Sequence, residues 1–178
     1  MNVELKLTTK SEAQIIKNLI PLYLHDISEF DGRHPTDHGL ICDDGDLKTI
    51  AEQGEAHRGW WSASEIFFPY LIVADGKPAG FNLISRGAGV PKEIEADVIV
   101  HEFFITHAFR GTKVGEEAAV QGFDLFRGRW EVVTYPEHER AIGFWRKAIG
   151  RYMDGAFTES VGDHVWGKKV IFRFNNGQ

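Results

Sequence analysis

Cysteine and long apolar runs are both scarce in this sequence. Cys42 is the only cysteine among 178 residues, so no internal disulfide can form and the chain does not depend on an oxidising compartment. The longest apolar run, residues 66–74, has nine residues and contains Pro69, whereas a membrane-spanning helix needs about 20. The first twelve residues lack the basic and apolar regions of a secretory signal. These absences predict a cytoplasmic protein with no membrane partner.

Positive charge is also in short supply. The chain has 20 Lys and Arg against 26 Asp and Glu, a formal net charge of −6. We therefore expect no nucleic-acid partner, and any anionic ligand must be held by a local arrangement of residues. Apolar residues make up 43% of the chain and aromatic residues 12%, which is enough for a buried core. The length predicts a single domain, residues 1–178.

The apolar periodicity predicts an alternation of strands and helices. Residues 3–7 alternate as a strand, and an amphipathic helix follows in which Pro21 is expected to cause a kink or an interruption. A long loop, residues 29–46, comes next. The remaining pattern predicts, in chain order, a short helix (47–57), a hairpin (70–74 and 79–84), a strand (94–106), a helix (114–126), a strand (130–135), a helix opening at Pro136 (136–148) and two strands (156–160 and 165–174). The fold class is therefore α/β (α+β).

The junction between strand 94–106 and helix 114–126 carries the clearest chemical signal. It reads Arg110-Gly-Thr-Lys-Val-Gly115. A loop that enters a helix presents unpaired backbone N–H groups, and the helix dipole adds positive potential, so such a place can bind phosphate. The spacing fits neither a P-loop nor a dinucleotide fingerprint. On these residues alone, a turn that merely needs its glycines is an equally good interpretation.

The surrounding residues favour the phosphate-binding interpretation. Residues 102–115 resemble the acetyl-CoA-binding motif of the GNAT superfamily of N-acetyltransferases, V-x-P-x-[YF]-R-G-x-G-[IV]-G, and residues 136–147 resemble the second motif of that family. The sequence is similar to a bacterial branch of the family that has no settled substrate. The resemblance implies a mixed, mostly antiparallel central sheet of about seven strands flanked by helices and splayed between the fourth and fifth strands. It also implies acetyl-CoA as cosubstrate.

The resemblance assigns the cofactor-binding residues. Backbone groups of Phe104 and Ile105 would bind the pantetheine arm. Three residues depart from the usual family pattern: Lys113 stands in place of the middle glycine, His138 in place of Asn, and Trp145 in place of Tyr. An indole N–H cannot protonate a departing thiolate. The other positions implied for the cofactor are Arg110, Gly111, Thr112, Val114 and Gly115, whose amides would hold the pyrophosphate, and Phe144 in the second motif.

Acetyl transfer to an amine also needs a base and, in many enzymes, an acid. Glu102 is the first candidate for the base and His101 the second. Strand alternation places them on opposite faces, so both can reach one cleft only if a bulge intervenes. Tyr135 and Tyr152 are the candidate acids. A mechanism without a dedicated acid is equally acceptable because the thiol of coenzyme A is a fairly good leaving group.

The acceptor side is expected to be acidic and aromatic, which suits a cationic amine. A solvated acidic loop and two packing tryptophans are the plain alternative. His25, His34 and His38 match no metal-ligand spacing, so no metal is predicted. The candidate substrate-binding residues are Asp26, Glu29, Asp31, Trp60 and Trp61.

Two functions remain open on the sequence. The first is an acetyl-CoA-dependent N-acetyltransferase, an acyltransferase acting on a primary amine of a small molecule or peptide. The second is a noncatalytic acyl-CoA-binding or protein-interaction module with the same fold, for which Trp145 is the main argument. The exposed end strands common in this fold make a homodimer reasonable.

Overall fold

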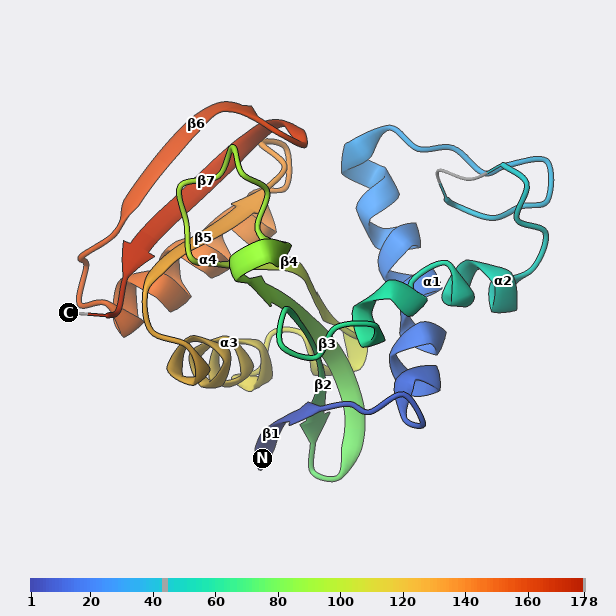
Figure 1. The fold of residues 1–178 in the computed structure, drawn as a ribbon, viewed down its shortest axis with the longest axis horizontal. Coiled ribbons are helices and arrows are strands. Elements are labelled where there is room, and N and C mark those ends of the chain that lie inside the picture. Colours follow the sequence, from blue (N-terminus) through green and yellow to red (C-terminus); the bar gives the residue numbers. More distant parts are fainter. Residues whose placement is uncertain (43–44, 178) are drawn as a thin grey trace.

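One seven-stranded sheet organises the protein. The computed structural model describes residues 1–42 and 45–177, and the sheet has the order β1-β2-β3-β4-β5-β7-β6 (Figure 1). Every neighbouring pair is antiparallel except β4 and β5. The strands are β1 (Val3–Leu7), β2 (Phe67–Ala74), β3 (Lys77–Arg86), β4 (Val98–Ile105), β5 (Arg129–Thr134), β6 (Thr158–His164) and β7 (Gly167–Asn175). The helices are α1 (Ala13–Asp31), α2 (Ile50–Glu55), α3 (Val114–Leu125) and α4 (Glu139–Tyr152).

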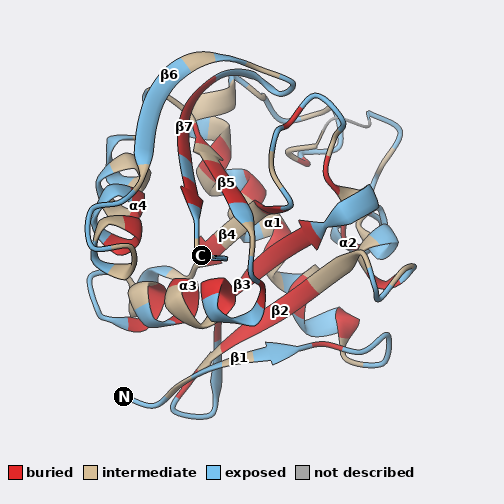
Figure 2. Cartoon of the chain, turned by 60° about the vertical axis from the view of Figure 1, so that its left-hand side comes forward, coloured by how far each residue is buried: buried red, intermediate tan, exposed pale blue. Residues whose placement is uncertain are grey.

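Helices cover both faces of the sheet. The apolar side of α1 packs on β2 and β3, with Ile16, Ile20, Leu71 and Phe81 in one cluster. α3 and α4 pack on the opposite face, and the buried residues of the sheet form a continuous band between the layers (Figure 2). The sequence expectation of an α/β fold with about seven mostly antiparallel strands and flanking helices is confirmed.

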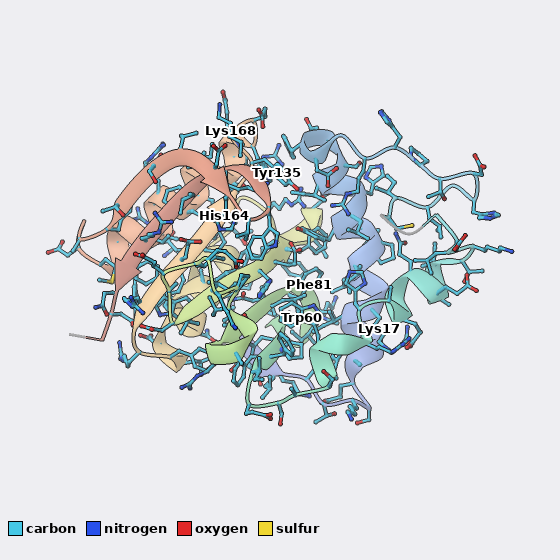
Figure 3. The ribbon with its side chains drawn as sticks, turned by 45° about the horizontal axis from the view of Figure 1, so that its top comes forward. Lys17, Trp60, Phe81, Tyr135, His164 and Lys168 are labelled. Atoms are coloured by element: carbon cyan, nitrogen blue, oxygen red, sulfur yellow. The ribbon has the colours of Figure 1, made fainter. Side chains whose placement is uncertain are left out.

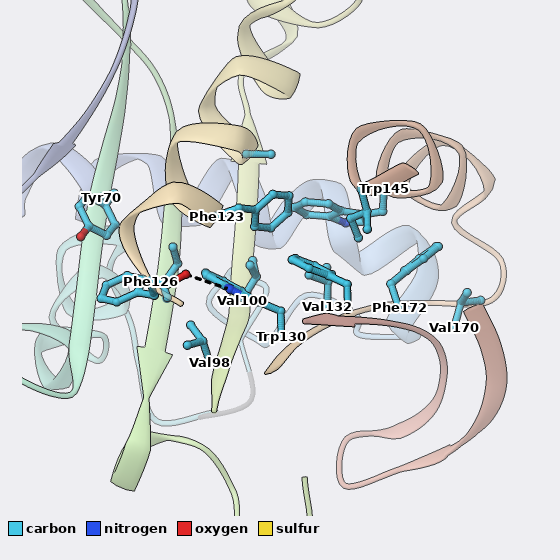
Figure 4. Packing of buried hydrophobic residues seen from close by; sticks show 14 residues of the cluster. Tyr70, Val98, Val100, Phe123, Phe126, Trp130, Val132, Trp145, Val170 and Phe172 are labelled. Atoms are coloured by element: carbon cyan, nitrogen blue, oxygen red, sulfur yellow. Dashed lines mark hydrogen bonds between the residues drawn. The ribbon is translucent and has the colours of Figure 1, made fainter. Parts of the chain in front are cut away.

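Aromatic side chains fill the layer between the sheet and α3 and α4. Trp145 of α4 is only 5% exposed and lies beside Phe123 of α3 (Figure 4). Trp130 stacks on Phe174 at 5.9 Å, and its indole N–H donates to the carbonyl of Phe126 over 3.3 Å. Burying one such side chain stabilises the fold by about 2–3 kcal/mol. This layer fixes the position of α4 beside the second half of β4.

β4 and β5 separate after a short stretch of parallel pairing. Only residues 98–100 of β4 pair with residues 130–132 of β5. β4 then continues to Ile105 and β5 to Thr134 without further pairing between the two strands. The predicted splay between the fourth and fifth strands is thereby confirmed. It leaves backbone N–H and C=O groups of two neighbouring strands available to a ligand at the same place.

A β-bulge lies at the point where the two strands begin to separate. Leu83 of β3 pairs with Glu102 and Ile84 pairs with Val100, so His101 has no partner of its own. A bulge of one residue interrupts the alternation of side chains. His101 and Glu102 consequently face the same side of the sheet, the side that α1 covers.

Several boundaries differ from the sequence expectation: α1 extends to Asp31 into the expected loop, β4 begins at Val98 rather than at residue 94, α4 continues to Tyr152, and β6 spans Thr158–His164 rather than residues 156–160. Pro21 does not interrupt α1, which runs unbroken through it. An internal proline removes one helical hydrogen bond and crowds the carbonyl four residues before it, which is that of Lys17. α2 packs against this turn, with Gly54 so near that an added Cβ would lie 3.1 Å from Lys17 Cβ. α4 begins at Glu139 rather than at Pro136, because the N–H of His138 donates to the carbonyl of Tyr135 and closes a turn first. Residues 43 and 44 of the predicted loop lie outside the described residues.

Candidate active site

A cleft of about 1210 Å³ opens where β4 and β5 separate. Its walls come from distant parts of the chain: α1, the second half of β4, the end of β5, the start of α4 and the turn between β6 and β7. Two loops lead into it, one after each of the two splayed strands. The candidate base and most of the candidate cofactor residues line this single cleft.

The loop after β4 has the geometry of an anion-binding turn. A 3₁₀ helix (His107–Phe109) is followed by Gly111, whose φ of +74° lies in the left-handed region that favours glycine. Thr112 Oγ1 donates to the carbonyl of Phe109 over 2.6 Å and accepts the N–H of Val114 over 3.3 Å. The first turn of α3 starts immediately afterwards, so its N–H groups point outward at the end where the helix dipole is positive.

Arg110 holds this loop against α1. Its Nε donates to the carbonyl of Ile105 over 2.7 Å, and its Nη2 forms an ion pair with Asp26. Burial by itself would raise the pKa of Asp26, but the hydrogen bond and charge of Arg110, together with His107, hold that pKa below its usual value. Arg110 therefore faces the cleft already paired with a carboxylate.

Gly115 lets the start of α3 lie close to Phe144 and Ile105. A Cβ added there would lie 3.2 Å from Phe144 Cε2 and 3.5 Å from Ile105 Cγ1. Gly111, Thr112 and Gly115 line the cleft. Lys113 and Val114 do not: Lys113 is exposed, and Val114 is buried with Ile72 and Ala118.

The second half of β4 forms the edge of the splay. Phe103 points toward α4, where it stacks on Phe144 at 5.5 Å and meets Trp145 edge-on at 5.0 Å. Phe104 and Ile105 line the cleft, and both residues keep their pairing with β3 on the other side of β4. This leaves an apolar floor and an unpaired strand edge along the place expected for the pantetheine arm.

His138 sits at the N-terminus of α4 across from α1. Its ring stacks on Phe30 at 4.0 Å with an interplanar angle of 16°. Its Nδ1 is buried without a hydrogen-bond partner, and burial lowers the pKa of the ring. An unsatisfied ring nitrogen in a cleft wall is a candidate contact for a bound ligand.

Glu102 is the most unusual ionisable group of the cleft. Burial raises the pKa of its carboxyl to about 7, although a hydrogen bond from Tyr23 and the charge of Arg33 both act to lower it. The Tyr23 hydroxyl donates to Glu102 Oε2, and burial beside this carboxylate raises the phenol pKa well above its usual value, so the phenol stays protonated. Glu102 can therefore accept a proton near neutral pH.

His101 lines the cleft beside Glu102, as the bulge requires. Its Nε2 lies 2.7 Å from Ser85 Oγ, which donates to the carbonyl of Gly89 over 2.8 Å. Because that hydroxyl proton is already used, His101 Nε2 is the donor of the pair. Its ring lies between Trp60 and Trp166, and burial lowers the pKa to about 4. His101 is a packed, neutral imidazole and a weaker base than Glu102 at neutral pH.

The two candidate acids lie in different places. Tyr135 lines the cleft, with Lys169 Nζ 3.9 Å from the centre of its ring. The Tyr152 hydroxyl donates to Asp124 over 2.9 Å and accepts from Asn176 over 3.2 Å at the far end of α4. Tyr152 is not among the residues that line the cleft.

The expected acidic wall is largely neutralised. Asp31 pairs with Arg33, as Asp26 does with Arg110, whereas Glu29 lines the cleft. Trp61 is buried beneath α1, where its indole N–H donates to Thr8 Oγ1 over 3.1 Å. Trp60 is not among the residues that line the cleft, and its ring meets His101 edge-on at 5.0 Å.

Sequence reasoning missed several residues of the cleft. Tyr23 follows Leu19 and Ile20 at helical spacing on the apolar side of α1, and this position was the available signal that it faces the sheet. Nothing in the local sequence indicated Lys169 or Trp166, because the β6–β7 turn comes to the cleft only through the pairing of β7 with β5.

Metal and membrane features are not found in the described part of the chain. No group of three His, Cys, Asp or Glu residues there could hold a metal ion. No helix between residues 1–42 or 45–177 is long and apolar enough to cross a membrane.

Comparison with known proteins identifies the fold. No family model matches the sequence, and no curated protein matches it either. Solved structures do match over almost the whole chain. A crystal structure of the aminoglycoside acetyltransferase AAC(6')-Ib with coenzyme A is 17% identical, with a TM-score of 0.66 over 98% of this chain and 95% of that one. The chain has the GNAT acetyltransferase fold.

Other proteins with the GNAT fold are equally similar. RimL, a ribosomal L7/L12 alpha-N-protein acetyltransferase in complex with coenzyme A, is 10% identical with a TM-score of 0.68 over 99% of this chain and 96% of that one. An acetyltransferase from Thermus thermophilus is 14% identical, with a TM-score of 0.64 over 98% and 97%. The resemblance to the GNAT superfamily seen in the sequence is thus confirmed at the level of the fold.

Proposed function

We propose that this protein is an acetyl-CoA-dependent N-acetyltransferase that acts on a primary amine of a small molecule or peptide. The observation that carries the proposal is the position of Glu102. A carboxylate with a pKa of about 7 faces the cleft at the point where β4 and β5 separate. The coenzyme A complexes of proteins with the same fold support the choice of cosubstrate.

The loop residues fit the phosphates of acetyl-CoA. We assign the pyrophosphate to the amides of residues 110–115 and the pantetheine arm to the edge of β4 at Phe104 and Ile105. The left-handed Gly111 and the absence of a Cβ at Gly115 support this assignment, because a main chain without Cβ atoms can approach a diphosphate closely. His138 Nδ1 would gain the hydrogen-bond partner that it lacks.

Glu102 performs the first chemical task. It accepts a proton from the ammonium form of the acceptor, either directly or through a water, and thereby frees the nitrogen lone pair. The neutral amine then attacks the thioester carbonyl, and backbone N–H groups at the splay stabilise the oxyanion. When the carbon–sulfur bond breaks, the electron pair leaves with sulfur. The proton for the thiolate comes from the acceptor nitrogen through solvent or from Tyr135.

A binding measurement followed by an activity measurement tests the proposal. Calorimetric titration with acetyl-CoA, coenzyme A and ATP should show saturable binding of the first two and none of ATP. Thiol release should then depend on an added primary amine, and Glu102→Gln should lower the turnover while the acetyl-CoA affinity stays the same. Absence of acetyl-CoA binding would contradict the choice of cosubstrate. Full activity of Glu102→Gln would contradict the assignment of Glu102 as the base.

One observation favours a second candidate, a noncatalytic acyl-CoA-binding module. The position expected to carry a phenol is occupied by Trp145, which is buried in the core against Phe103. Both candidates predict binding of acetyl-CoA. Only the enzyme predicts amine-dependent release of the thiol, so the second measurement decides between them.

A further inference from the structure

Lys169 is a buried cation that the proposed chemistry does not use. It begins the buried part of β7, is only 5% exposed and lines the cleft. Its Nζ donates to the carbonyl of Trp166 over 2.6 Å and lies over the ring of Tyr135. An ammonium group has three donors, and within the described residues the carbonyl of Trp166 is its only hydrogen-bond acceptor. A buried ammonium usually has a carboxylate partner or a ligand.

Carboxylates lie around Lys169 but do not pair with it. Burial lowers the pKa of Lys169, while the charges of Asp31, Glu137 and Glu102 act in the opposite direction. Asp31 is already bound to Arg33, and Glu102 accepts from Tyr23. Among the residues that the structure describes, no carboxylate oxygen forms an ion pair with Lys169 Nζ. Among the described residues, the ammonium therefore has fewer acceptors than donors.

The acceptor side of the cleft thus carries charges of both signs. Glu102 accepts a proton from the incoming amine, and Lys169 offers a buried positive charge nearby. A polycation would place like charge against the buried ammonium of Lys169, which is unfavourable. A molecule with an ammonium group and a carboxylate on one small framework would satisfy both Glu102 and Lys169.

We propose that the acceptor is an amino-carboxylate, such as a free amino acid or a short peptide, whose carboxylate binds Lys169 while its amine faces Glu102. This inference rests on the proposed acetyltransferase function and narrows its substrate class. Tyr135 would lie beneath the ion pair, and the β6–β7 turn with Trp166 would close over it.

Matched acceptor pairs test the proposal. Thiol release is measured with a panel of free amino acids and with the corresponding amino acid carboxamides, which keep the side chain and amine but lack the negative charge. We expect kcat/KM to be about tenfold or more higher for the acids, as for other buried charge pairs. Lys169→Met should remove most of that preference and Lys169→Arg should restore part of it. The ratio of acid to amide is compared between variants, so that the different basicity of the two amines cancels.

Two controls separate this role from a general one. Lys168→Met removes the same charge from the exposed neighbour of Lys169 and should leave the preference for acids over amides unchanged. Figure 3 shows Lys168 at the outer edge of the β6–β7 hairpin and Tyr135 between that hairpin and α1. All assays are run at one pH of about 8, above the pKa of about 7 of Glu102, and the ratio of acid to amide is taken within each variant. A lysine that only tuned the base would then change both acceptors of a pair equally.

The outcomes distinguish the two proposals. If acetyl-CoA binds and amides or polyamines react as well as the acids, the acceptor assignment is wrong and the acetyltransferase function stands. The same conclusion follows if Lys169→Met keeps the wild-type preference. If acetyl-CoA does not bind, the proposed function itself fails. If no amine reacts, the binding of the amino acids is measured by calorimetry in the presence of coenzyme A. The inference is overturned if the amino acids do not bind, or if Lys169→Met binds them as tightly as the wild type.

Discussion

The hydrogen bond from Tyr23 to Glu102 gives the sharpest test of the proposed base. Tyr23→Phe removes one hydroxyl from the α1 side of the cleft and leaves the ring in its edge-on contacts with Phe81 and Phe104. The hydrogen bond lowers the pKa of Glu102 because it stabilises the ionised carboxylate. When this hydrogen bond is lost, less opposes the effect of burial on the carboxyl, and the pKa of Glu102 must rise above about 7.

The size of the shift follows from the energies of the two protonation states. A hydrogen bond to a charged group contributes about 1.5–3 kcal/mol and one between neutral groups about 0.5–1.5 kcal/mol. The middle values of these ranges differ by about 1.3 kcal/mol, which corresponds to about one pKa unit. With a pKa near 8, the ionised fraction at pH 7 falls from about one half to about one tenth, so kcat/KM falls about fivefold. Above pH 9 the variant and the wild type should converge.

The assay is the pH profile of kcat/KM for thiol release, recorded with one amine from pH 5.5 to 9.5. The expected result is a parallel displacement of the ascending limb by about one unit. Tyr152→Phe is the matched control, since this hydroxyl binds Asp124 outside the cleft. The pH profile of this variant should coincide with that of the wild type. If the ascending limb does not move in Tyr23→Phe, the ionisation of Glu102 does not cause that limb, and the assignment of Glu102 as the base is refuted.

Three further predictions concern stability and cofactor affinity. The pKa of Glu102 is about 7 in the folded protein against an ordinary 4.5, so the buried carboxylate lowers the stability of the fold as the pH rises from about 4.5 to about 7. Glu102→Gln should therefore raise the free energy of unfolding by about 3 kcal/mol at pH 8. Near pH 4 urea denaturation should show no difference between the variant and the wild type. Gly115→Glu should abolish acetyl-CoA binding in calorimetry, whereas Gly143→Glu, at an exposed position of α4 with open space around it, should not. Asp26→Asn frees Arg110 from its ion pair and should tighten acetyl-CoA binding by up to about fivefold at low salt; weaker binding would show that Asp26 instead positions Arg110.

The strand and helix pattern was largely readable from the sequence because each element repeats its own period. Residues 70–74 and 79–84 alternate around a turn with Asp75 and Gly76, and both strands appeared where expected. The splay was implied only by resemblance. It depends on where pairing between residues 98–100 and 130–132 stops, and neither strand contains a local signal for that point. The same holds for the bulge at His101, which is a property of the register with β3.

The partners of charged residues were the least predictable feature of the site. Asp31 and Arg33 are two residues apart, so their ion pair could have been anticipated. Asp26 and Arg110 are 84 positions apart in the sequence, and only the packing of α1 against the loop after β4 brings them together. Treating every acidic residue of the first helix as free to meet an amine therefore overestimated the negative charge of the acceptor side.

The bulge and the close approach of β3 to β4 are two parts of one arrangement. In a regular strand, Glu102 would face α3 and α4, where Phe103 now packs against Phe144; the extra residue at His101 turns the carboxylate toward α1 and Tyr23 instead. Beyond the bulge, β3 holds β4 so tightly that a Cβ at Gly80 would lie 1.9 Å from the carbonyl oxygen of Phe104. β4 is therefore anchored on its β3 side while its β5 side stays unpaired. The base and the open strand edge consequently keep a fixed relation to each other, which acyl transfer between two bound substrates requires.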